Sequence, residues 1–155
     1  MEELEYDFIT FYRLFFYNSI SFLGGYPDII SECLNHQKPD KKCMEYAIIS
    51  HIIDFVTFLM NEHNIEIDLF SCGIYKNLES FLVYFDQTND LNQCLIYSSM
   101  FNIPSLCEYF ISHDANVNEK GKDGLTALHY AGDYNSKETA ELLLSHEANV
   151  NENKI

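Results

Sequence analysis

The stretch SHEANVNEN, from Ser145 to Asn153, decides the fold because the chain contains almost the same nine residues once more. The earlier copy, SHDANVNEK, runs from Ser112 to Lys120, and seven of the nine positions are identical. The two copies start 33 residues apart. A fixed period of this length is typical of a chain that stacks one supersecondary unit several times. We therefore expect a solenoid, in which neighbouring units share one apolar core.

The same offset also relates side chains upstream of the repeated phrase, since Tyr97 falls on Tyr130. A weaker match lies further upstream, where NLESFLVYF at 77–85 is similar to NIPSLCEYF at 102–110 at an offset of 25. This offset is eight residues shorter than the period of 33. The difference lies after residue 85, where the short segment DQTND leads directly into the next predicted helix without a loop between units. The upstream part is therefore predicted to be a degenerate form of the repeat.

The last unit carries the clearest local signals. Gly124 completes an Asp-Gly dipeptide that is typical of a tight turn, and Thr126 is a suitable N-cap for a helix over 127–134. Asn135 fits a left-handed position, because asparagine tolerates a positive φ better than most residues. Apolar residues then recur at helical spacing and predict a second helix over 137–146. The unit is thus predicted to be a turn followed by two helices.

These residues carry a resemblance to a family. The segment GKDGLTALHYAGDYNSKETAELLLSHEANVN, residues 121–151, resembles an ankyrin repeat, which is marked by G-x-T-P-L-H-x-A-A and a closing L-L-x-x-G-A-x-x-N. The matching positions are Gly124, Thr126, Leu128, His129, Ala131, Leu143, Ala148 and Asn151. The resemblance implies an all-α solenoid of stacked antiparallel helix pairs, with short β-hairpin-like fingers near the C-terminus. It also implies that His129 has a structural role, in hydrogen bonding with Thr126.

Three parts are expected within one continuous solenoid. Residues 1–38 are predicted to form an N-terminal helical cap, and residues 91–155 two ankyrin repeats. Residues 39–90 are similar to the degenerate ankyrin-like domain of unassigned function that precedes regular repeats in large protist ankyrin families. The family prefers glycine at the positions of Asp114 and Glu147, so left-handed helix ends are expected to cost about 1–2 kcal/mol there.

Charge narrows the class of partner. The chain has 24 acidic and nine basic residues, with a net charge of −15. Nucleic-acid and anionic membrane binding require clustered lysine or arginine, and the sequence contains no such cluster. We expect a protein partner, with a basic surface if charge steers the encounter. The five cysteines form no CxxC pair and no signal peptide precedes them, so a cytoplasmic or nuclear location is expected.

No arrangement of residues predicts catalysis. His113 and His146 lie one repeat apart, so they should form a surface row and not converge on a metal. Cys94 and Cys107 align with alanines and are predicted to be buried and inert. We therefore expect neither enzymatic activity, nor a metal, nor a cofactor. A hydrolase or metalloenzyme is the least favoured class.

The favoured function is a protein–protein interaction module that binds its partner through a concave groove and finger loops. The predicted contact residues are Met100, Phe101, Lys122, Asp123, Leu125, Asp133 and Tyr134. The alternative is a regulatory subunit or inhibitor, which would use the same groove to block the active site of a partner enzyme. The last helix keeps three leucines at 142–144, which predicts an exposed apolar face open to self-association or further repeats.

Overall fold

The structure is a computed structural model of the chain, and it describes residues 39–150. The fold below is that of the compact unit that begins at Lys41. The predicted N-terminal cap and the motif residue Asn151 lie outside the described residues.

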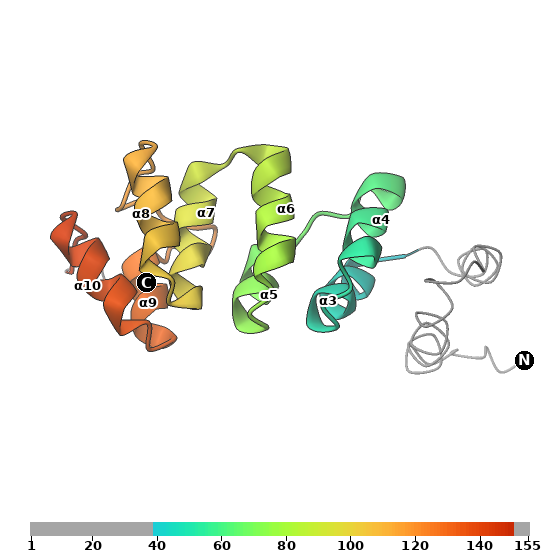
Figure 1. Ribbon diagram of the computed structural model, residues 1–155, viewed down its shortest axis with the longest axis horizontal. Coiled ribbons are helices and arrows are strands. Elements are labelled where there is room, and N and C mark those ends of the chain that lie inside the picture. Colours follow the sequence, from blue (N-terminus) through green and yellow to red (C-terminus); the bar gives the residue numbers. More distant parts are fainter. Residues whose placement is uncertain (1–38, 151–155) are drawn as a thin grey trace, which may run out of the picture. The chain divides into compact units, whose positions relative to one another are not determined.

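Residues 39–150 form helices and contain no β-strand, which confirms the predicted all-α class. The helices are α3 (Lys41–Ile49), α4 (Ile53–His63), α5 (Leu69–Ile74), α6 (Leu78–Thr88), α7 (Leu91–Ser98), the 3₁₀ turn η1 (Ser99–Phe101), α8 (Pro104–Ser112), α9 (Ala127–Asp133) and α10 (Lys137–Ser145). They form four consecutive pairs that follow one another along this unit (Figure 1). The stack of helix pairs expected from the repeat is therefore present.

Two rows of helices result from this stacking. Helices α3, α5, α7 and α9 each pack on the next and form what we call the inner row. Their partners α4, α6, α8 and α10 form the outer row. Each pair buries its apolar side chains against its neighbour, as the fully buried Phe81 does with Phe101 and Phe110. No pair has a core of its own, which is the usual situation in a solenoid.

The repeated ANVN phrase joins one unit to the next through its second asparagine. Asn118 Oδ1 accepts a hydrogen bond from the backbone N–H of Asn149 at 2.8 Å, and its Nδ2 donates to the carbonyl of Glu147 at 3.3 Å. In the preceding unit Asn92 Oδ1 accepts from the backbone N–H of Asn116 at 2.8 Å. In both cases an asparagine side chain of one unit satisfies a backbone N–H of the loop that follows in the stack.

The loops between pairs differ in length as the sequence predicts. Only two residues separate α6 from α7, and Asp90 caps α7 by accepting from the Gln93 N–H at 3.1 Å. The loop between α8 and α9 is much longer and forms the one finger of the described region. Its tip is a turn in which the Gly121 N–H donates to the Leu125 carbonyl at 2.8 Å. The finger has no strand, so the hairpin is limited to this turn.

In the described part, each helix except α7, which runs on into η1, is followed within two residues by a left-handed residue that is not glycine. These residues are His51, Asn64, Lys76, Asn89, Asn102, Asp114, Asn135 and Glu147. The φ angles of 53° at Asn135, 70° at Asp114 and 65° at Glu147 confirm the expectations for these positions. An L-residue in this conformation costs about 1–2 kcal/mol, and asparagine less than most.

One alignment made from the sequence is wrong by a single residue. The match of NLESFLVYF with NIPSLCEYF pairs Asn77 with Asn102, but Asn77 has an ordinary φ of −84° and is the N-cap of α6. The left-handed residue of that unit is Lys76, and it is the counterpart of Asn102. The two segments are therefore similar in sequence at an offset of 25, while their backbone conformations correspond at an offset of 26.

Replacing Asp114 or Glu147 by glycine is expected to stabilise the fold. Each change removes the left-handed penalty but adds chain entropy to the unfolded state, so the expected gain is about 0.5–1 kcal/mol per site. Urea denaturation of the single variants measures it. Asn135→Gly is the matched control and should change the free energy of unfolding by less, because asparagine already tolerates this conformation. A loss of stability in both glycine variants would contradict the backbone geometry described here.

Candidate partner-binding surface

The start of α9 uses the motif residues Thr126 and His129 for local structure. The Thr126 N–H donates to His129 Nδ1 at 3.2 Å, and the Thr126 hydroxyl lies 2.8 Å from the same nitrogen. Because Nδ1 accepts from the backbone, the neutral ring carries its proton on Nε2. Thr126 is buried. The pair therefore fixes the junction between finger and helix, as the resemblance implies.

Asp123 holds the finger against α9. The Tyr130 hydroxyl donates to Asp123 Oδ2, and Asp123 Oδ1 accepts from the Leu125 N–H at 3.1 Å. Burial, and then the hydrogen bond to Asp123, raise the pKa of Tyr130 well above its ordinary value. Asp123 is exposed, but both of its oxygens already have partners within the unit. Its role is to position the finger that carries the exposed Lys122.

Met100 was predicted to contact a partner, and this prediction is wrong. Its side chain is fully buried against Ile96 and Tyr130. The neighbouring helix α5 approaches it so closely that a Cβ on Gly73 would lie 2.4 Å from the Met100 sulfur. The sequence places Met100 beside the exposed end of the helix, but the extra turn η1 rotates it into the core.

Phe101 and Tyr134 meet at a lysine that the sequence did not single out. Lys76 Nζ lies 6.0 Å from the centroid of the Phe101 ring and 5.8 Å from that of Tyr134, and it donates a hydrogen bond to the Met100 carbonyl. Burial lowers the pKa of Lys76. We call these residues the Lys76 clamp. Since they come from three successive units, the clamp ties α5, η1 and α9 together.

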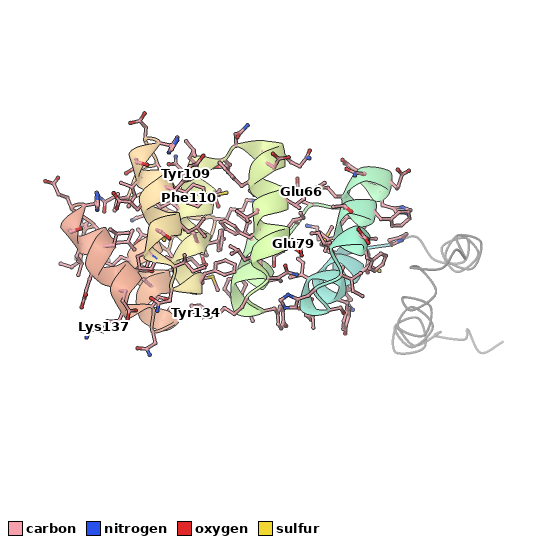
Figure 2. All side chains as sticks on the ribbon, in the orientation of Figure 1. Glu66, Glu79, Tyr109, Phe110, Tyr134 and Lys137 are labelled. Atoms are coloured by element: carbon pink, nitrogen blue, oxygen red, sulfur yellow. The ribbon has the colours of Figure 1, made fainter. Side chains whose placement is uncertain are left out.

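The remaining predicted residues are distributed along α9. Lys122 is exposed in the finger that precedes the helix, and Asp133 is exposed at its last turn. Leu125 and Tyr134 are half-buried and pack on the cluster formed by Ile96, Met100 and Tyr130. Figure 2 shows Tyr134 and Lys137 toward one end of the helix pairs, with Tyr109 and Phe110 toward the other. The predicted residues therefore lie before and at the end of α9 and do not form a single cluster.

The sequence did not indicate a group of aromatic rings on the inner row as a site, although the offset of 33 residues relates Tyr97 to Tyr130. The ring of Tyr130 lies 5.3 Å from that of Tyr97 and 6.1 Å from that of Phe70. We call these three residues, from α9, α7 and α5, the inner aromatic patch. Burial raises the pKa of Tyr97, the hydrogen bond with Tyr130 lowers it, and the charges of Asp123 and Asp68 raise it again.

The buried cysteines are expected to be unreactive in the folded protein. Burial raises the pKa of Cys72 and Cys94 to about 12 and that of Cys107 to about 11, so the reactive thiolate is scarce near neutrality. Iodoacetamide at pH 8 should leave all three unmodified in peptide maps. The same reagent in 8 M urea should modify them fully. Rapid labelling of the folded chain at Cys94 or Cys107 would contradict the packing.

His113 and His146 occupy equivalent positions as the C-caps of α8 and α10. His113 Nδ1 lies 2.7 Å from the Tyr109 carbonyl, and His146 Nδ1 lies 3.0 Å from the Leu142 carbonyl. Within residues 39–150 no three histidine, cysteine or acidic side chains are placed to hold a metal ion. The same part of the chain has no helix with the length and apolarity needed to span a bilayer.

The last helix pair exposes less apolar surface than the three leucines suggest. Leu143 is fully buried, while Leu144 is 45% exposed. Leu142 is intermediate, because α10 packs on α8 as well as on α9. The predicted apolar face is thus reduced to Leu144 and to Val150, which lies beyond the helix.

Comparison with known families agrees with this geometry. The family described as "Ankyrin repeats (3 copies)" matches residues 72–154, and a "Domain of unknown function (DUF3447)" matches residues 17–84. The ankyrin match begins within α5, upstream of the expected start at residue 91. No curated protein matches the chain. Since the ankyrin match covers more than half of the sequence and the described helices stack in pairs, this chain belongs to the ankyrin-repeat family.

Proposed function

We propose that the chain is a non-catalytic protein-binding module that holds its partner on the inner row and on the finger between α8 and α9. Ankyrin repeats are protein–protein interaction modules, which gives the general class. The observation that supports the finer proposal is the inner aromatic patch, where the partly exposed rings of Phe70 and Tyr97 pack on the buried ring of Tyr130 from a third unit. Large, rigid aromatic side chains on a fixed scaffold are the usual anchors of a protein interface.

The proposed contact residues extend from this patch along α9. Lys122 and Asp133 are exposed, while Leu125, Phe101 and Tyr134 each offer part of a packed side chain. Asp123 is exposed as well, and its hydrogen bonds to Tyr130 and Leu125 hold the finger in place. The net charge of −15 favours a partner with a basic surface, so the association rate should fall as salt is added.

Site-specific photo-crosslinking tests this surface. Chains that carry benzoylphenylalanine in place of Lys122 or Asp133 are expected to crosslink a protein captured from cell lysate. The matched control replaces Glu141, which is exposed on the outer helix α10. Crosslinks from Glu141 alone would place the partner on the outer row and overturn the proposal. If the captured protein is an enzyme and loses its activity in the complex, the chain is an inhibitor that uses this surface.

A further inference from the structure

We propose that the inner aromatic patch, together with the carboxylates of Asp68 and Asp123, binds an arginine or lysine side chain in a basic segment of the partner protein. This inference rests on the proposed function and names the chemistry that the inner row recognises. It concerns Phe70, Tyr97 and Asp68, none of which the sequence indicated as a site.

The patch offers aromatic surface in a fixed position. Phe70 on α5 is 38% exposed, and its ring lies 6.1 Å from that of Tyr130 at an interplanar angle of 55°. Tyr97 on α7 is half-buried and lies 5.3 Å from Tyr130. Tyr130 is itself almost fully buried and contacts both of the other rings. The accessible faces are therefore those of Phe70 and Tyr97.

Two carboxylates flank these rings. Asp68 is the N-cap of α5, two residues before Phe70, and its Oδ2 accepts from the Ser71 N–H and hydroxyl at 3.1 and 2.6 Å. Asp123 lies in the finger and accepts from Tyr130. Asp123 thus contacts the patch directly through Tyr130, and Asp68 caps the same helix end that carries Phe70. In agreement with this placement, the charges of both carboxylates raise the pKa of Tyr97. Within residues 39–150 neither carboxylate forms an ion pair, so their negative charge is not neutralised there.

The occupant that fits aromatic faces between two carboxylates is an organic cation. Ring faces attract an ammonium or guanidinium group, and the carboxylates add charge attraction in a partly buried setting. The Lys76 clamp already uses this chemistry within the chain, since its ammonium lies about 6 Å from two aromatic rings. In the clamp the cation is a lysine of the chain itself. Among residues 39–150, no lysine or arginine lies over the rings of the inner aromatic patch. Charge complementarity therefore favours a basic protein segment.

Peptide binding to the full chain tests the assignment. The probe is a fluorescein-labelled peptide, Gly-Arg-Gly-Arg-Gly, and the control peptide carries citrulline, which has the shape of arginine without its charge. The arginine peptide should bind in fluorescence anisotropy titrations at low salt and shift the ring proton resonances of Phe70 and Tyr97. The citrulline peptide should bind at least about fivefold more weakly. Equal binding of the two peptides would overturn the proposal.

A pair of double variants separates the patch from the general acidity of the chain. Asp68→Asn with Phe70→Leu keeps the N-cap acceptor and the apolar volume, and it should weaken arginine-peptide binding about tenfold. The matched control is Asp86→Asn with Leu82→Ala, which removes one exposed acid and one exposed apolar side chain from α6. It should change the affinity less than about twofold. Equal losses in both double variants would show that only net charge is sensed.

Two checks keep the result interpretable. Far-UV circular dichroism verifies that the patch variant is folded, and Asp68→Asn alone should still weaken binding about threefold if Phe70→Leu disturbs α5. Crosslinking from Lys122 reports on the proposed function independently of the peptide. If the crosslinks form but the arginine peptide does not bind the patch, the cation assignment fails while the binding surface stands.

Discussion

Replacing Phe81 by alanine should lower the free energy of unfolding by about 4 kcal/mol. Phe81 is fully buried, and its ring lies 5.3 Å from that of Phe101 and 6.1 Å from that of Phe110. It therefore fills part of the space between the α5–α6 and α7–α8 pairs. The alanine variant would leave a cavity that rigid helices cannot close. Urea denaturation followed by circular dichroism measures the loss.

The next residue on the same helix provides the control. Leu82 is 43% exposed, so Leu82→Ala should cost less than about 1 kcal/mol. Both variants place alanine on α6, so the difference between their free energies of unfolding reports mainly on packing between units. If the two losses were equal, Phe81 would not be the side chain that joins these pairs.

Asn77→Ala should cost about 2 kcal/mol, the second largest effect expected in the described part. Asn77 is 2% exposed, its Nδ2 donates to the Ile48 carbonyl at 2.8 Å, and its Oδ1 accepts from the Ser80 N–H at 3.0 Å. Alanine would remove the N-cap of α6, at a cost of about 1 kcal/mol. It would also remove one of the two hydrogen bonds to the buried Ile48 carbonyl, which would keep the bond from the His51 N–H at 3.1 Å, at a further cost of about 1 kcal/mol. Equilibrium unfolding in urea measures the total.

Two further variants, Asn77→Asp and Asn102→Gly, test whether the hydrogen bond from Asn77 to Ile48 accounts for the loss of stability, and not the removal of any asparagine. Asn77→Asp keeps the capping acceptor but loses the donor to Ile48, so it should remain strongly destabilising. Asn102 is exposed and left-handed, so glycine there should change stability by less than about 1 kcal/mol. A mild effect of Asn77→Asp would mean that the cap, and not the hydrogen bond between units, carries the energy.

The repeat made much of the fold predictable. One phrase at a fixed offset predicts stacked units, and Asn118 then bonds to the next copy as such a stack requires. Asp114 and Glu147 occupy positions where the family has glycine, and both have positive φ. Features of this kind repeat along the chain, so one unit predicts the next.

The candidate site was harder to predict because its contacts cross between units of unequal length. Met100 lies one residue before Phe101, and only the 3₁₀ turn η1 decides that the first is buried and the second is partly exposed. The sequence match pairs Asn77 with the left-handed Asn102, but the residue with a positive φ in that unit is Lys76. A shift of one residue in a degenerate unit changes which side chain reaches the neighbour, and sequence similarity does not resolve it.

Hydrogen–deuterium exchange of the full chain with and without a captured partner tests the central claim most directly. The account predicts that the partner slows exchange in α5, α7, α9 and the finger before α9, because these elements form the proposed binding surface. Exchange in α4, α6 and α10 should change little. Slowed exchange confined to the outer row, with the inner row unchanged, would contradict the claim that stacked helix pairs bind a partner through their inner row.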